Sequence, residues 1–101
     1  MVEVVIQKSS SKGKKYDAVI TDKEGKTKTV SFGNKGYSDF TMHKDEERKE
    51  RYIARHGATQ SWKDINKPQT WARYLLWEEK TIPKAIKKME SKFNIDIKNK
   101  I

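Results

Sequence analysis

The sequence predicts a small α+β domain, in which an antiparallel β-meander of about three strands packs against about three helices. Three observations predict this class. The first third alternates polar with apolar residues, later segments space apolar residues three and four apart, and Gly33 and Gly36 separate the two parts. The chain has 101 residues, one domain's length, so we expect a single domain over residues 1–101. Within it we expect the meander over 1–36, a helical part over 37–93 and a C-terminal tail over 94–101.

The first third contains three predicted strands. Residues 2–7 are rich in β-branched side chains, and the polar break SSSKGK follows them. Residues 16–21 and 27–32 alternate in polarity, and the connection between them, DKEGK, offers Gly25 for a positive φ angle. We expect an antiparallel sheet with one packed and one solvated face, which needs helices on top to be stable.

A charged helix is predicted to follow the two glycines. It begins at Thr41 or His43 and ends at Gly57, because its acidic residues come before its basic ones, as the helix macrodipole favours. Its apolar stripe is thin. Most of this helix should therefore face solvent or a partner.

Two further helices and a tail complete the chain. Pro68 opens the segment PQTWARYLLWEEK, which is apolar on most sides, and a last helix runs from Thr81 to Asn94. The tail IDIKNKI is either a short strand or an arm that becomes ordered on a neighbouring subunit. The residues we expect in the core are Trp62, Trp71, Tyr74, Leu75, Ile82, Ile86 and Phe93.

Charge and composition restrict the classes of function. Lys and Arg number 23 against 14 acidic residues, and the net charge of +9 indicates an anionic partner, either nucleic acid or an acidic protein surface. Cysteine is absent, which excludes disulfides, thiolate zinc sites and thiol catalysis. The apolar start is too short for a signal peptide, and no run is long enough to span a membrane, so we expect no membrane partner and a reducing cytoplasm.

No residue pattern predicts catalysis. His43 and His56 are thirteen positions apart, a spacing that fits neither HxxxH on one helix face nor a two-histidine, one-carboxylate metal site. The carboxylates of residues 45–50 lie among Lys and Arg, as on a solvated helix face. We therefore predict no catalytic residue, no metal and no cofactor, and expect that the protein is not an enzyme.

Basic residues interleaved with aromatics are compatible with nucleic-acid binding, by phosphate neutralisation and base stacking. However, residues 44–56 carry four acidic residues against five Lys and Arg, and no helix-turn-helix, zinc finger or RNP-type strand is present. A sign-mixed helix beside exposed aromatics favours protein recognition. The alternative stays open that the aromatics simply cover the sheet; these are Tyr37, Phe40, Tyr52 and Trp62.

The string GYSDFTMHKDEERKERYIARH, followed by a Trp and later by a Pro and WARYLLW, resembles a family of small proteins encoded by tailed phages and large DNA viruses. The family run has the form KGYSDFTxHKDxxRKxxYIxRH, then a Trp, then a Pro shortly before WxRxLLW. The resemblance covers roughly residues 32–93. Where many relatives have Pro-Gly, this chain has Pro68 and Gln69. The matched positions are Lys35 to Phe40, His43 to Asp45, Arg48, Lys49, Tyr52, Ile53, Arg55, His56, Trp62, Trp71, Arg73, Leu75, Leu76 and Trp77.

In crAss-like gut phages a member of this family looks like an auxiliary capsid protein, which sits on the outside of the major capsid protein shell and reinforces it. The resemblance thus implies a structural virion protein, assembled in the host cytoplasm, whose partners are the major capsid protein and neighbouring capsid components. A homo-oligomer on the shell stays open. The alternative is a basic nucleic-acid-binding protein acting in viral replication or packaging.

The expected partner contacts are a hypothesis based on their clustering within the matched block. They are Tyr37, Asp39, Phe40, His43, Lys44, Arg48, Tyr52, Arg55 and His56.

Overall fold

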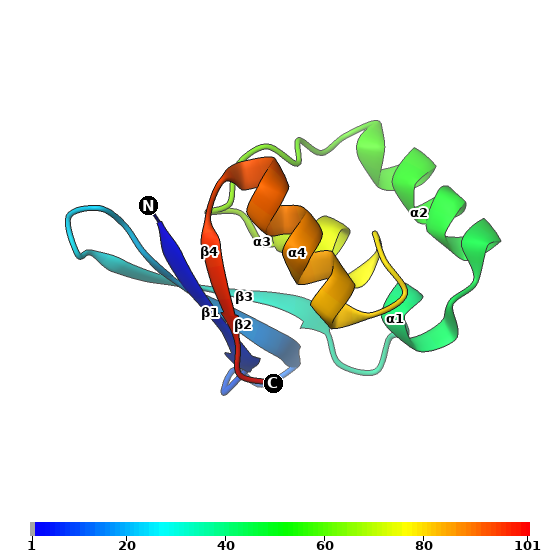
Figure 1. Ribbon diagram of the computed structural model, residues 1–101. Helices are drawn as coiled ribbons and strands as arrows, with labels where there is room; N and C mark the ends of the chain where they lie inside the picture. The colour runs from blue at the N-terminus through cyan, green and yellow to red at the C-terminus, as the bar shows by residue number, and fades with distance from the viewer. Residues whose placement is uncertain (1) are drawn as a thin grey trace.

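A mixed four-stranded sheet carries helices on one face in the computed structural model, which describes residues 2–101 (Figure 1). The strand order is β3-β2-β1-β4. The molecule is a single α+β domain, as the sequence predicts. The strands are β1 (Glu3–Lys8), β2 (Lys14–Thr21), β3 (Thr27–Asn34) and β4 (Asp96–Asn99).

The tail corrects the prediction of an all-antiparallel sheet of three strands. The pairs β1–β2 and β2–β3 are antiparallel as predicted, but β4 adds a fourth strand that runs parallel to β1, with Ile97 opposite Val4. Asn94 ends the preceding helix in the left-handed conformation, at φ 53°, and so turns the chain back along the sheet. Ile95 and Ile97 are then buried, which explains why the tail is ordered on its own subunit.

One face of the sheet forms half of the core. Alternate residues of each strand point to the same side, where the helices cover them. Gly33 marks the end of this face: its φ is +75°, and a Cβ there would lie 2.9 Å from Leu76 Cδ1. Only glycine fits this approach of β3 to the helical layer. The buried hydrophobic residues of the strands are Val4, Ile6, Ala18, Ile20, Val30, Phe32 and Ile97.

The first predicted helix is divided in two. Lys44 adopts φ 55°, which ends α1 (Phe40–His43), and α2 (Glu46–Gly57) begins after the N-cap Asp45. The Asp45 carboxylate accepts hydrogen bonds from the backbone N–H groups of Glu47 and Arg48. Asp45 therefore caps a helix instead of lying in its first turns, because a short carboxylate satisfies the free N–H groups there.

The second predicted helix is α3 (Pro68–Trp71), and the chain continues into η1 (Ala72–Leu76), a π-helical turn. The last helix is α4 (Ile82–Phe93), with Thr81 at its N-cap and Asn94 at its C-cap, as predicted. The prediction of about three helices thus becomes four α-helices and one π-helical turn in the described residues. No helix within residues 2–101 is long and apolar enough to cross a membrane.

The helical half of the core comes from α3, η1 and α4. Of the expected core residues, Trp71 and Leu75 are fully buried and Ile86 is 6% exposed. Trp62 lies outside the core cluster: it is half-buried, and its ring faces the Arg73 guanidinium at 5.1 Å. The remaining three are half-buried and pack around the edge of the core, and they are Tyr74, Ile82 and Phe93.

Helix α2 stands apart from this layer and is joined to it by α1 and by the long segment 58–67 (Figure 1). Only one of its residues, Tyr52, is buried. The helix therefore contributes little to the core and leaves most of its surface open.

Candidate functional site

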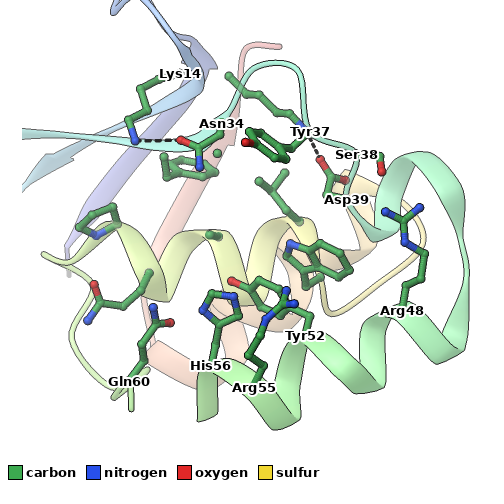
Figure 2. Close-up of a pocket in the computed structure, with 18 of the residues that line it drawn as sticks. Lys14, Asn34, Tyr37, Ser38, Asp39, Arg48, Tyr52, Arg55, His56 and Gln60 are labelled. Carbon is green, nitrogen blue, oxygen red and sulfur yellow. Dashed lines mark hydrogen bonds and ion pairs between the residues drawn. The ribbon is translucent and has the colours of Figure 1, made fainter. Parts of the chain in front are cut away.

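A cleft of about 680 Å³ separates α2 from the open end of the β2–β3 hairpin, where β2 begins and β3 ends (Figure 2). We call it the basic cleft, because five Lys and Arg residues line it against one acidic residue. One wall is α2, the opposite wall is the hairpin end with the loop after β3, and α3 and η1 form the floor. Its size falls in the range of roughly 300–1,000 Å³ that ligand sites occupy.

The α2 wall is basic although the helix as a whole is nearly balanced. Arg48, Arg51 and Arg55 are three and four positions apart, so they share one face, and all three line the cleft. All three side chains are exposed, and none forms an ion pair with another residue in the described part of the chain. The acidic residues of the helix do not line the cleft, and they are Glu46, Glu47 and Glu50.

The opposite wall supplies Lys14, Lys15 and Tyr37. The Lys14 ammonium donates a hydrogen bond to Asn34 Oδ1 at 3.2 Å, and Tyr37 is 73% exposed. The Lys15 ammonium lies 2.6 Å from Asp39 Oδ2, and both side chains are largely buried. Because Asp39 is the one carboxylate lining the cleft and Lys15 neutralises it, the α2 arginines face no counter-charge there.

Stacked rings hold α2 to the floor. The rings of Tyr52 and Trp77 are parallel within 4°, with centroids 4.3 Å apart, and His56 covers Tyr52 at 4.3 Å. Burial raises the pKa of the Tyr52 hydroxyl, and the charges of Arg73 and Arg55 offset part of that rise. The ring of Tyr52 is therefore in contact with other rings of the protein, and Tyr37 is left as the exposed aromatic residue of the cleft.

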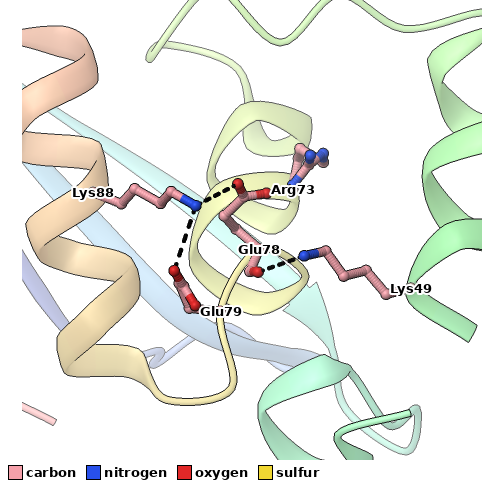
Figure 3. Close-up of polar contacts among 5 residues, drawn as sticks. All are labelled: Lys49, Arg73, Glu78, Glu79 and Lys88. Carbon is pink, nitrogen blue, oxygen red and sulfur yellow. Dashed lines mark hydrogen bonds and ion pairs between the residues drawn. The ribbon is translucent and has the colours of Figure 1, made fainter. Parts of the chain in front are cut away.

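A polar network behind the floor forms the second attachment of α2 (Figure 3). The Lys49 ammonium donates to the Glu78 backbone carbonyl at 2.8 Å, and the Glu78 carboxylate accepts from Arg73 at 2.5 Å and from Lys88 at 3.0 Å. Burial alone would raise the pKa of Glu78, but the hydrogen bonds and charges of Arg73 and Lys88 hold it below its usual value. Glu78 is thus ionised at neutral pH, where it orders the segment that α2 contacts.

We expect Glu78→Gln to lower the free energy of unfolding by about 2 kcal/mol at pH 7, since hydrogen bonds to a charged group contribute roughly 1.5–3 kcal/mol. The depressed pKa makes this stabilisation complete above the unfolded-state pKa, and it is lost as pH falls through the lower folded-state pKa. Urea denaturation from pH 7 down to about pH 3 should show the two proteins converging in acid. A constant difference across that range would contradict the ionic role. The control is Glu24→Gln, because Glu24 belongs to an exposed ion pair with Lys26; this substitution should change the free energy of unfolding little.

The structure divides the predicted partner contacts into accessible and buried residues. Tyr37, Arg48, Arg55 and His56 line the cleft, as does Arg51, which the sequence prediction left out. Helical spacing from Arg48 and Arg55 was the signal that would have found Arg51. Lys14, also absent from the prediction, reaches the cleft through strand pairing that the sequence does not show.

Three predicted contacts are buried and make contacts within the domain. Asp39 and Phe40 are 3% and 2% exposed, and Tyr52 is 9% exposed. His43 packs its ring against Trp77 at 5.3 Å, and its Nδ1 accepts a hydrogen bond from the Asp45 N–H. Lys44 is exposed but lies outside the cleft lining. Within residues 2–101, no three His, Asp or Glu side chains are grouped so that they could hold a metal ion.

Comparison with known proteins matched the chain to a protein family. A protein-family model described as "Family of unknown function (DUF5754)" matches residues 4–56. This span runs from β1 to the end of α2, so it contains both walls of the basic cleft but not its floor. No curated protein and no solved structure matches the chain.

Proposed function

We propose that the protein, a member of the family of unknown function DUF5754, is an auxiliary capsid protein. It is a non-enzymatic structural component of the virion of a tailed phage, and it binds the outside of the major capsid protein shell and stabilises it. The observation that carries this proposal is the row of Arg48, Arg51 and Arg55, which is exposed on a helix held away from the core and forms no ion pair within residues 2–101.

Two properties of the molecule support a docking role. A basic wall complements an acidic surface and speeds encounter with it. The helix that carries this wall is attached at two defined points, the Tyr52–Trp77 stack and the Lys49 hydrogen bond to Glu78, so the backbone that bears the arginines is held in place. The resemblance of residues 32–93 to proteins of tailed phages and large DNA viruses supports the choice of the major capsid protein and its neighbours as that acidic surface.

Capsid co-sedimentation tests the proposal. We expect the triple variant Arg48→Gln, Arg51→Gln and Arg55→Gln to bind purified capsids at least about tenfold more weakly than the wild type, which corresponds to about 1.4 kcal/mol. Tyr52 is left unchanged because it is buried. Glutamine keeps the helix propensity and removes only charge.

The matched control removes three charges elsewhere. Lys84, Lys87 and Lys98 are exposed and do not line the cleft, so their triple glutamine variant has the same net charge of +6, from +9 minus 3. It should co-sediment like the wild type. Failure of the wild-type protein to bind capsids, or its absence from virions, would overturn the proposal.

The second candidate function is nucleic-acid binding in viral replication or packaging. The observation that favours it is the same excess of five basic residues over one acidic residue in the cleft. A gel shift across a salt series separates the two. A steep fall of affinity with salt on DNA or RNA, combined with weak capsid binding, would favour the nucleic-acid function.

A further inference from the structure

We infer that the basic cleft binds an extended acidic segment of a protein partner, with carboxylates at alternating positions that reach the α2 arginines. This inference rests on the proposed function and names the chemistry of its contact. The partner segment would lie between α2 and the hairpin end, where Lys14 and Tyr37 face the arginines (Figure 2).

The charges of the cleft define the ligand as an anion. Arg51 and Arg55 form a like-charge pair four positions apart, and Arg48 adds a third charge on the same helix face. Such an arrangement costs stability unless an anion compensates for it. The Arg guanidinium is planar and binds a carboxylate or a phosphate through two parallel hydrogen bonds.

The surroundings favour carboxylates of a peptide over a nucleic acid. Binding of single strands depends on aromatic faces that are free to stack on bases. The Tyr52 ring is covered by Trp77 and by His56, which leaves Tyr37 as the single well-exposed ring in the cleft lining on which a base could stack. The outer side of α2 carries three exposed glutamates, which would repel a long polyanion that extends beyond the cleft.

The spacing of the arginines favours an extended peptide. Along the helix axis, Arg51 and Arg55 are separated by about 6 Å, from a rise of 1.5 Å per residue. Alternate side chains of an extended strand lie on one face, about 6.7 Å apart. Acidic residues at positions i and i+2 of a partner therefore match Arg51 and Arg55, and Tyr37 on the opposite wall can pack against the peptide backbone.

Fluorescence anisotropy with short labelled peptides tests this inference directly. The probe peptide alternates Glu with Ser, a second peptide has the same composition with its Glu residues in one block, and a third replaces every Glu by Gln. We expect the alternating peptide to bind most tightly, the block peptide several-fold more weakly, and the Gln peptide not at all. A thymidine oligonucleotide of equal charge is the competing probe.

The same two triple variants test whether the peptide binds at the α2 arginines of the basic cleft. The Arg48, Arg51 and Arg55 variant should lose about tenfold or more of the affinity for the alternating peptide, while the Lys84, Lys87 and Lys98 variant stays near the wild type. The arginine variant should unfold at close to the wild-type temperature, because it loses no ion pair within residues 2–101, and the relieved repulsion opposes the lost interaction of Arg55 with the helix macrodipole. Equal binding by both variants, or tighter binding of the oligonucleotide through the same arginines, would overturn the inference.

Failure of the inference and failure of the proposed function are distinguishable. If capsid binding survives the arginine substitutions, the proposed function stands, and the inference that the cleft binds an acidic segment is wrong. If the alternating peptide binds in the cleft but the protein does not bind capsids, the proposed function is wrong and the inference about the acidic segment stands.

Discussion

Trp71→Ala is expected to lower the free energy of unfolding by about 3–5 kcal/mol, the range for truncating a large aromatic residue in a core. Trp71 is fully buried and stacks on Phe32, with centroids 6.0 Å apart. Its indole N–H also donates to the Ile65 carbonyl at 2.6 Å, which ties the segment before α3 to the core. Native domains have only about 5–15 kcal/mol in total, so the variant should lose a large share of its stability and unfold at a much lower urea concentration than the wild type.

Urea denaturation followed by circular dichroism measures this effect, since two other tryptophans complicate fluorescence. The matched control is Trp62→Ala. Trp62 is half-buried and lies outside the core cluster, so its loss should cost about 1–2 kcal/mol. Equal losses at the two tryptophans would contradict the placement of Trp71 at the centre of the core.

Asp39→Ala is the second substitution with a large expected effect, about 3–5 kcal/mol, because removing one partner of a buried ion pair leaves the other uncompensated. Asp39 is 3% exposed, and its carboxylate lies 2.6 Å from the Lys15 ammonium. The other carboxylate oxygen accepts from the Thr41 N–H at 3.0 Å and so caps α1. The substitution therefore removes a charge partner and a helix cap together.

The controls separate these two contributions. Asp45→Ala removes an exposed N-cap with no ion pair and should cost about 1 kcal/mol. The double substitution Asp39→Leu with Lys15→Met removes both charges and should recover much of the loss, as apolar replacements of buried pairs do. If Asp39→Ala cost no more than Asp45→Ala, the pair with Lys15 would contribute nothing.

The candidate site was predicted in part because helical spacing is a local property. Arg48, Arg55 and His56 were named from the charged block, and they do lie together on one face of α2. The prediction also counted charges over the whole helix and judged it balanced, whereas the acids and the cleft arginines occupy different faces. Periodicity gives the relative angles of side chains, and it does not give the face that meets the rest of the molecule.

The buried residues of the predicted interface show the same limit. Phe40 and Tyr52 are large aromatics beside charged residues, a composition that fits a binding surface and a core equally well. Their burial follows from contacts with distant residues, such as Trp77 against Tyr52. Asp39 was named as a contact because of its motif, yet its partner Lys15 lies 24 positions away, on strand β2.

The sequence by itself determined the α+β class, the meander, the bounds of α4 and the start of α3, because each follows from periodicity, proline or capping over a few neighbouring residues. Only the tertiary structure decided that the tail joins the sheet beside β1, that Asp39 is paired with Lys15, and that α2 stands across a cleft from Lys14. These features bring together residues far apart in the chain. The burial and charge pairing that stabilise them exist only once the domain has folded.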